Sequence, residues 1–310
     1  MFQGMEYVYE VYKEKSFSKA AANLFISQPS LSANVKRVEK RIGYPIFDRS
    51  TKPLSLTECG KQYIHCVERI MNIERDFSDF INDWGGLKTG NLVLGGSNLF
   101  SSWILPPLIA QFASRYPHIQ IQLIEESTIK LTEMLQRGKI DLLLENTNLD
   151  SEIFDFRLYQ EEHLLLAVPG MFKVNDSLKE FQLTVSDIQT GKFLDPKVPT
   201  VPFSSFKNEP FIMLKQENDT GQRARDICRK NHFEPVIAFE MDQQMTSYNV
   251  TCSGMGISFI GDIIITKVTP NPNVIYYKLP LKDNCRNICF YWKKGRYLSR
   301  AMDEFLKMCR

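Results

Sequence analysis

The chain has 310 residues, of which 43% are hydrophobic and 24% are charged. This composition is typical of globular proteins, and the length suffices for about two or three domains. The N-terminus lacks the apolar core of a secretory signal, and no stretch approaches the roughly 18 uninterrupted apolar residues that a membrane span needs. We therefore expect a cytoplasmic protein with no membrane partner.

The net charge of +2 conceals an uneven distribution along the chain. Residues 1–65 contain 10 Lys or Arg and 6 Asp or Glu, whereas the remaining residues contain 28 basic and 30 acidic side chains. A basic segment on a slightly acidic body favours phosphate binding by the N-terminal part alone.

Three helices and a hairpin are predicted at the N-terminus. The first helix spans residues 5–14, and Ser16 or Ser18 can cap the second, whose consecutive alanines at 20–22 allow another helix to approach closely. The third helix begins after the N-cap candidate Ser27 and ends at Gly43.

The third helix and the segment after it complete a known arrangement. Apolar residues recur in this helix at spacings of four, three and four, and they are Leu31, Val35, Val38 and Ile42. Two short strands at 45–49 and 53–56 then form a basic wing. This order of elements indicates a winged helix-turn-helix, which lays one helix into the major groove of DNA.

The polar faces of the third helix and the wing carry the predicted DNA contacts. Gln and Asn can pair bidentately with adenine, Ser can donate or accept, and Lys and Arg bind phosphate. The alternative is a three-helix bundle with a polar face and no DNA partner. The predicted DNA-binding residues are Ser27, Gln28, Pro29, Ser30, Ser32, Asn34, Lys36, Arg37, Arg49 and Lys52.

Several motifs in this segment resemble one family. S-F-S-K-A-A-A-N-L, S-Q-P-S-L-S, I-F-D-R and L-T-E-C-G are similar to the N-terminal signature of the LysR-type transcriptional regulators. The resemblance implies a regulator that binds double-stranded promoter DNA. Relatives often have Arg where this chain has Ala33 and Gln where it has Asn34, so their base preference does not carry over.

A long helix is predicted from residue 58 to about 84, with Thr57 as its cap. Its apolar positions alternate at spacings of four and three, which is a heptad seam interrupted by Glu74. In the resembled family this helix forms the dimer coiled coil; packing onto the chain's own C-terminal domain is the alternative. The predicted dimerisation residues are Tyr63, Val67, Ile70, Phe77, Ile81 and Trp84. Residues 85–90, rich in glycine, would then form a hinge.

Strands and helices alternate after the hinge. Strands at 91–95, 119–123 and 140–144 flank two helices, which implies a mostly parallel sheet. A second unit continues the pattern from about residue 163, and near residue 267 the chain is expected to return to the first unit with strands at 274–278 and 287–292.

L-P-P-L-I-A-Q-F-A-S-R-Y-P, L-x-R-G-K-I-D-L-L-L and G-M-G-I-S-F-I are similar to the effector domain of the same family, which implies a two-lobed fold like that of periplasmic binding proteins. We therefore expect three parts. They are a winged helix-turn-helix domain at 1–57, a linker helix at 58–86, and an α/β effector domain at 91–310. Lobe I would hold about 91–161 and 267–310, and lobe II about 162–266. Residues 180–200 are longer than the family norm, and we assign them no function.

Ligands of open α/β lobes bind at the carboxyl ends of strands, and helix N-termini there attract anions. Polar turns follow several predicted strands, and two apolar residues could form a wall. Each polar residue could instead be only a helix cap. The predicted effector-binding residues are Ser97, Asn98, Ser101, Ser127, Thr128, Phe211, Met213 and Thr220. Together they favour a small organic effector with a carboxylate, although Asp219 would repel one.

The sequence lacks the residue patterns of enzymes, metal sites and disulfide-bonded proteins. The four histidines are scattered, and no nucleophile motif or phosphate loop follows a strand, so we expect no catalytic residues, no metal site and no enzyme such as a modified binding protein. The seven cysteines are scattered and odd in number, which argues against a disulfide framework. The closest alternative is a thiol-based redox regulator that uses Cys228. The predicted protein is a homodimer or homotetramer that binds DNA and a small effector and can contact RNA polymerase.

Overall fold

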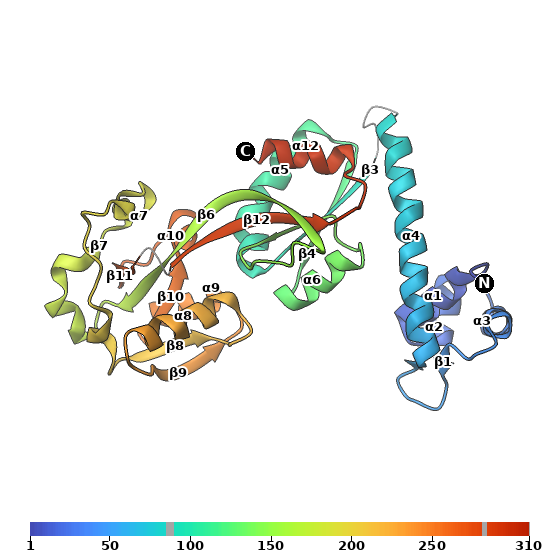
Figure 1. Cartoon of the computed structure of the whole chain (residues 1–310), viewed down its shortest axis with the longest axis horizontal. Helices are drawn as coiled ribbons and strands as arrows, with labels where there is room; N and C mark the ends of the chain where they lie inside the picture. Colours follow the sequence, from blue (N-terminus) through green and yellow to red (C-terminus); the bar gives the residue numbers. More distant parts are fainter. Residues whose placement is uncertain (85–89, 281–283, 310) are drawn as a thin grey trace. The chain divides into compact units, whose positions relative to one another are not determined.

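The computed structural model of the protein describes residues 1–84, 90–280 and 284–309. The chain divides into two compact units, Met1–Ile81 and Asn82–Arg310, which are drawn in Figure 1. Within the described residues, no helix is both long enough and apolar enough to cross a membrane. The predicted hinge at residues 85–90 lies outside the described residues, apart from Gly90.

The N-terminal unit has the predicted order of elements. The helices α1 (Met5–Glu14), α2 (Phe17–Asn23) and α3 (Gln28–Ile42) are followed by an antiparallel hairpin of β1 (Phe47–Asp48) and β2 (Ser55–Leu56). The long helix α4 then begins at Glu58 and is described to Trp84. This is a winged helix-turn-helix followed by a linker helix.

Side-chain caps set the starts of α2 and α3. Of the two candidate caps of α2, Ser16 is the one used, because its side chain accepts a hydrogen bond from the Lys19 amide. Ser27 accepts one from the amide of Ser30 at 3.3 Å. Gly43 ends α3 with φ of 85°, a left-handed conformation that glycine adopts without strain.

The core of this unit includes the first turns of α4. Leu31, Val35 and Val38 of α3 are buried, as predicted, and they share a core with Val8 and Val11 of α1. Tyr63, Ile64 and Val67 of α4 complete that core. The helix that was predicted to mediate dimerisation therefore begins as part of the core of the N-terminal unit.

The first lobe of the C-terminal unit is a mixed sheet. Strands β3 (Gly90–Gly96), β4 (Ile119–Glu125) and β5 (Leu142–Glu145) are parallel, with β3 between the other two. The helices α5 (Leu105–Arg115) and α6 (Thr128–Gln136) are the crossovers, as predicted. The C-terminal helix α12 (Arg300–Met308) packs against the same core through residues such as Phe305.

The second lobe repeats the pattern. Strands β8 (Pro210–Leu214), β9 (Val236–Met241) and β10 (Ile257–Gly261) are parallel to one another, with β8 in the middle. The helices α8 (Asp219–Lys230), α9 (Gln244–Cys252) and α10 (Asp262–Lys267) connect or follow these strands. Aromatic side chains such as Phe203, Phe211 and Phe259 fill its core.

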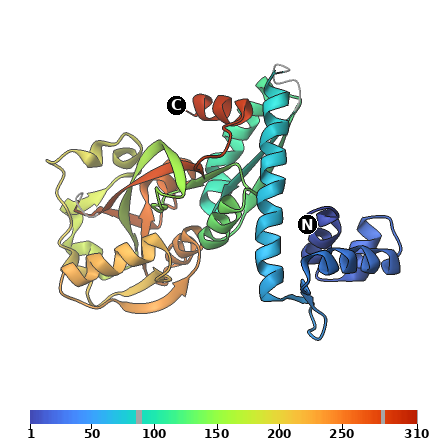
Figure 2. The ribbon, with the colours of Figure 1, turned by 45° about the vertical axis from the view of Figure 1, so that its right-hand side comes forward.

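Two long strands pass between the lobes. In Figure 1 and Figure 2, β6 (Phe154–Pro169) and β12 (Cys285–Lys293) run side by side from one lobe toward the other. The first part of β6 pairs with β12, and its last residues pair with β10 and β11 (Val274–Lys278). The two strands form an antiparallel ribbon that connects the lobes.

The expected return of the chain near residue 267 is wrong for one strand. β11 pairs with the end of β6 and with the short β7 (Gln182–Leu183), so it belongs to the sheet of the second lobe. The chain returns through β12 instead. The sequence could not indicate this because β6 is long enough to pair with both strands, and an apolar strand pattern does not specify its partner.

The long segment near residues 180–200 packs against the second lobe. It holds the short helix α7 (Val185–Gln189), and its buried residues Ile188 and Phe193 join a core with Ile264 of α10. The Lys278 ammonium on β11 donates to the backbone oxygens of Asp195 at 2.8 Å and Val198 at 3.1 Å. The segment is thereby fixed to the sheet.

Candidate functional site

The predicted DNA-binding residues lie on the outer faces of α3 and the wing. Those from Ser27 to Ser30 are exposed at the start of α3, as are Lys36 and Arg37 further along and Lys52 in the wing. Ser32 and Asn34 are partly exposed. The buried stripe faces the opposite way, so α3 presents a polar surface that begins at its N-terminus.

Some of these residues also have side-chain contacts inside the unit. Arg37 donates to the Asn34 side-chain oxygen at 3.1 Å, which orients both side chains. Arg49 pairs with Glu39 at 3.2 Å, and its guanidinium lies 5.2 Å from the centre of the Phe17 ring. Arg49 therefore fastens the wing to α2 and α3, a role that the sequence did not indicate, while its predicted DNA contact stays a prediction.

The predicted dimerisation residues of α4 fall into two groups. Tyr63 and Val67 are buried in the core of the N-terminal unit, so they are not available to a partner chain, and Ile70 is half-buried. The side chains toward the end of the helix are exposed: Phe77 at 65%, Ile81 at 53% and Trp84 at 83%. Ile73 and Phe80 are also exposed. The apolar surface lies in the second half of the helix because the first half is used by the head.

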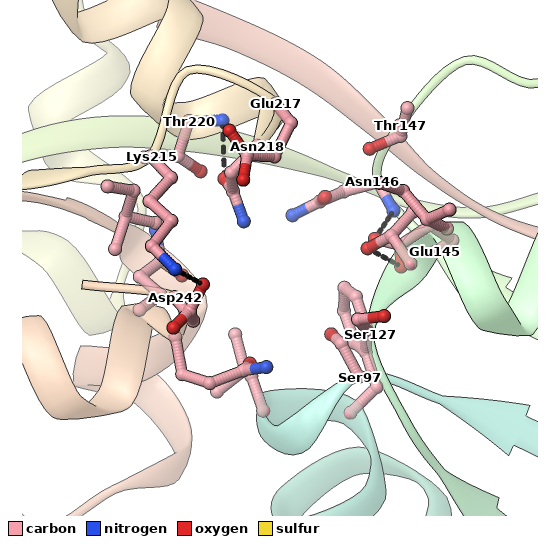
Figure 3. Close-up of a pocket in the computed structure, with 17 residues that line it drawn as sticks. Ser97, Ser127, Glu145, Asn146, Thr147, Lys215, Glu217, Asn218, Thr220 and Asp242 are labelled. Atoms are coloured by element: carbon pink, nitrogen blue, oxygen red, sulfur yellow. Dashed lines mark hydrogen bonds and ion pairs between the residues drawn. The ribbon is translucent and has the colours of Figure 1, made fainter. Parts of the chain in front are cut away.

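A cavity of about 230 Å³ lies between the two lobes of the C-terminal unit. Figure 3 shows polar side chains converging on it from both sides. They come from turns that follow β3, β5, β8 and β9 and from the starts of α6 and α8, which agrees with binding at the carboxyl ends of strands. The polar lining residues are Ser97, Ser127, Thr128, Glu145, Asn146, Thr147, Lys215, Glu217, Asn218, Thr220, Asp242, Gln243 and Gln244.

Half of the predicted effector-binding residues line this cavity: Ser97, Ser127, Thr128 and Thr220. Ser127 is the N-cap residue of α6, yet its side chain makes no capping hydrogen bond. Asn218, by contrast, caps α8 by accepting from the Thr220 amide at 2.9 Å. The alternative in which the predicted residues only cap helices therefore does not describe the Ser127 side chain, whereas Asn218, a lining residue outside the predicted set, does cap a helix.

The other predicted residues lie elsewhere. Asn98 donates to Glu125 at 2.9 Å, and the buried Ser101 hydroxyl donates to the Gly96 carbonyl at 2.8 Å. Phe211 and Met213 point into the core of the second lobe. The predicted apolar wall is absent at these two positions because β8 is buried on both faces, and only Leu214 at its end reaches the cavity.

Sequence reasoning missed the residues after β5 and β9. Glu145, Asn146 and Thr147 end or follow β5, and Asp242, Gln243 and Gln244 follow β9. The rule that identified the other turns, a polar residue at the carboxyl end of a parallel strand, would also have identified these.

The cavity contains more carboxylates than cations. Glu145 accepts from the Thr128 hydroxyl and the Asn146 amide, both at 2.9 Å, and burial raises its pKa. Lys215 forms an ion pair with Asp242 at 2.7 Å. The hydrogen bond to Asp242 and its charge raise the pKa of Lys215.

Gln244, a residue of the cavity wall, has a buried and unsatisfied donor. Its side chain lines the cavity although the residue is only 8% exposed. Its amide nitrogen finds no hydrogen-bond partner within the described part of the chain. A buried donor of this kind costs about 1–3 kcal/mol when unpaired, and a molecule in the cavity could accept from it only after the side chain had turned.

A buried polar network lies behind the cavity. Asn146 donates to Glu162 of β6 at 3.0 Å, and Arg286 of β12 donates to the same carboxylate at 2.6 Å. Arg286 also donates to Asp219 at 2.9 Å and to Thr220 at 2.7 Å. These contacts join the first lobe, the connecting ribbon and the start of α8 in the second lobe.

The structure weighs against a redox role for Cys228. This cysteine lies in α8 with 1% of its surface exposed, inside the core of the second lobe. Burial raises the pKa of its thiol to about 12. Since the thiolate is the reactive form, Cys228 is a poor nucleophile toward a peroxide.

Comparison with known proteins gives consistent matches over both units. The model of the bacterial regulatory helix-turn-helix protein, lysR family, matches residues 2–61, and that of the LysR substrate binding domain matches residues 85–310. The HTH-type transcriptional regulator YcgK of Bacillus subtilis (strain 168), described as uncharacterized, is 28% identical over 99% of this chain and 93% of its own length.

Solved structures with the same fold include two full-length regulators. A full-length, singly substituted OxyR from Pseudomonas aeruginosa is similar over 100% of this chain and 94% of its own, with a TM-score of 0.73 and 17% identity. CbnR complexed with its target DNA matches over 100% of this chain and 99% of its own, with a TM-score of 0.63 and 17% identity.

The raised pKa of Glu145 predicts a pH-dependent effect of the Glu145→Gln substitution. Because the folded state binds this proton more tightly than the unfolded state, the carboxyl group lowers stability as pH rises from its ordinary pKa of 4.5 through the raised value. The glutamine variant does not titrate. The free energy of unfolding of the variant minus that of the wild type should therefore increase over this pH window, as measured by urea unfolding.

Glu217→Gln is the matched control, because Glu217 lines the same cavity and its side chain is exposed to water. We expect a weaker pH dependence for this variant. A Glu145→Gln difference that stayed flat or fell with rising pH would show that burial does not control this carboxyl group.

Proposed function

The chain belongs to the LysR-type family of DNA-binding transcriptional regulators, and from that premise we propose that a small effector bound between its two lobes controls DNA binding by its N-terminal unit. The observation that carries this proposal is the cavity whose polar walls come from both lobes. A ligand that touches both walls favours the arrangement in which it makes more contacts, and so shifts an existing equilibrium between arrangements.

In this proposal α3 enters the major groove with its exposed N-terminal end. Gln28 and Ser30 lie there and can contact base edges, whereas Arg37 and Lys36 are placed for phosphate. Lys52 in the wing extends the basic surface, and Arg49 holds the wing in place through Glu39. Phosphate contacts supply affinity and base contacts supply sequence preference.

We further propose that the second half of α4 forms the contact with another copy of the chain. The exposed Ile73, Phe77, Phe80 and Trp84 recur at spacings of four, three and four, which is the spacing of a coiled-coil seam. Two such helices would present two DNA-binding heads, and a dimer of dimers would present four. RNA polymerase is the further partner that a regulatory role implies.

The cavity favours a small effector that carries both a carboxylate or similar acceptor and a cationic or donor group. Its volume of about 230 Å³ is below the roughly 300–1,000 Å³ of pockets for drug-sized ligands. The start of α6 at Ser127 and Thr128 suits a carboxylate or another acceptor, because helix N-termini offer amide donors and a positive dipole end. Glu145, Glu217 and Asp242 suit a cationic or donor group. We propose an amphoteric molecule such as an amino acid or a small amide-bearing acid.

Two substitutions in α3 should separate base contacts from phosphate contacts. Gln28→Ala should relax base preference, costing about 1–3 kcal/mol on the preferred operator, with little effect on nonspecific DNA. Arg37→Ala should weaken binding to all sequences alike and reduce its salt dependence. Fluorescence anisotropy with operator and unrelated duplexes at several salt concentrations measures both effects.

Lys230→Ala is the control, since this residue lies at the end of α8 in the other unit and should leave DNA binding unchanged. If Gln28→Ala kept both the affinity and the preference of the wild type, α3 would not be the helix that reads DNA.

A thermal-shift screen of amino acids, small organic acids and aromatics should identify compounds that stabilise the C-terminal unit. A compound at 100 times its Kd adds about 2.7 kcal/mol to stability. Thr128→Val, which removes a hydroxyl from the cavity wall, should reduce the shift. Thr132→Val is the matched control, because Thr132 lies one turn later in α6 and does not line the cavity.

A compound that stabilised the Thr128→Val variant as strongly as the wild type would have to bind elsewhere. The same compound should change the affinity for operator DNA, and stabilisation without any change in DNA binding would contradict control by this cavity.

A further inference from the structure

Three potential metal ligands lie together on the ribbon that joins the lobes. Cys285 of β12 is the direct partner of His163 on β6. Glu161 lies two residues before His163, and since alternate side chains of a strand point to the same face, all three share one face of the ribbon. The neighbouring Glu162 and Arg286, also direct partners, occupy the opposite face, which belongs to the network behind the cavity.

The distances in this group suit a metal ion. One ligand atom from each of Glu161, His163 and Cys285 lies within 4.8 Å of the other two. Zinc binds sulfur, nitrogen and oxygen at about 2.0–2.3 Å, so tetrahedral neighbours are roughly 3.3–3.8 Å apart. A movement of about 1 Å by exposed side chains such as Glu161 and Cys285 would close the site, while the strand pairing holds the backbone in register.

A carboxylate orients the histidine. The backbone amide of His163 donates to one oxygen of Asp262 at 3.2 Å, and its ring Nδ1 lies 3.4 Å from the other. Phe193 packs against the edge of the ring, with centroids 5.9 Å apart. A proton held on Nδ1 toward Asp262 leaves Nε2 for a metal, and this arrangement of carboxylate, histidine and metal recurs in metalloproteins.

We propose that Glu161, His163 and Cys285 bind a divalent transition-metal ion of the zinc class, with Asp262 as the positioning residue. A thiolate, an imidazole and a carboxylate match the ligand preference of Zn²⁺, whereas Mg²⁺ and Ca²⁺ prefer oxygen ligands alone. Glu161 and Cys285 are exposed, so the ion has a path from solvent, and water can take the fourth position. This site goes beyond the proposed function and uses none of the cavity residues.

The charges around the three ligands are mainly negative, which suits a cation. Glu161 and Asp262 contribute two carboxylates beside the thiol. Among the described residues, the cationic Arg223 donates to the backbone oxygen of Cys285 at 3.4 Å and also pairs with Asp219 at 2.8 Å. Burial and the charge of Glu161 raise the pKa of the Cys285 thiol, and the charge of Arg223 only partly opposes them, so the thiol would release its proton on binding the metal. A bound ion would link β6 to β12 where His163 and Cys285 are paired, and would stabilise the ribbon.

The test is titration of the full-length, reduced protein with Zn²⁺ by calorimetry, and with Co²⁺ by absorption spectroscopy. We expect one site per chain that shows a thiolate-to-cobalt charge-transfer band, and a higher unfolding temperature with metal. Cys285→Ser should abolish the band and weaken Zn²⁺ binding at least about 100-fold. Asp262→Asn should weaken it about 10–100-fold, as loss of a partner to a metal-bound histidine does.

Cys66→Ser is the matched control, because Cys66 lies in α4, outside the group, and it should bind metal as the wild type does. Circular dichroism without metal checks that each variant is folded, and Glu161→Gln offers a second exposed ligand if Cys285→Ser is unstable. Zn²⁺ binding by folded Cys285→Ser with wild-type affinity, or a Co²⁺ complex without the thiolate band, would overturn the proposal.

Discussion

The arrangement of the two lobes in the C-terminal unit depends on a buried ion pair between Glu162 of β6 and Arg286 of β12. Their side chains are 0% and 1% exposed, and removing each charge from water costs several kcal/mol. Burial by itself would lower the pKa of Arg286, but the charges of Glu162 and Asp219 raise it. The pair also requires Gly261, where a Cβ atom would overlap a Glu162 carboxylate oxygen. The ion pair therefore depends on opposite charges, on hydrogen bonds and on the absence of a side chain at Gly261.

This ion pair connects the two walls of the cavity. Asn146, which lines the cavity in the first lobe, donates to Glu162, and Thr220, which lines it in the second, accepts from Arg286. A ligand that moves either wall therefore changes contacts of a buried charge, where small displacements are costly. The N-terminal unit has its own core, and apolar side chains are exposed at the end of α4. In the proposed function, DNA binding, assembly and ligand binding thus use different surfaces of the chain.

Local pattern predicted much of this organisation. The buried stripe of α3, the cap at Ser27 and the parallel strands of the first lobe follow from spacing and capping rules that act over a few residues. Long-range pairing was not predictable in this way: nothing local indicates that β11 joins the second lobe, that Arg49 reaches Glu39, or that Cys285 lies opposite His163. The sequence did not show which half of α4 is exposed. Tyr63 and Val67 fit the heptad pattern, but apolar residues at these positions are equally suited to the core of the N-terminal unit, where they lie.

A double-mutant cycle of Glu162→Leu and Arg286→Met tests the dependence on the buried pair most directly. Trp103 and Trp292 lie in the C-terminal unit, and a Trp84→Phe background removes the tryptophan at the end of α4, so urea unfolding of the full-length protein followed by tryptophan fluorescence reports on this unit. Arg286→Met leaves the buried Glu162 without its cation and should cost about 3–5 kcal/mol, whereas Glu162→Leu leaves Arg286 with Asp219 and should cost less. The double variant should be less destabilised than the sum of the two by at least about 2 kcal/mol. Additivity within about 0.5 kcal/mol would contradict a structure organised around this pair.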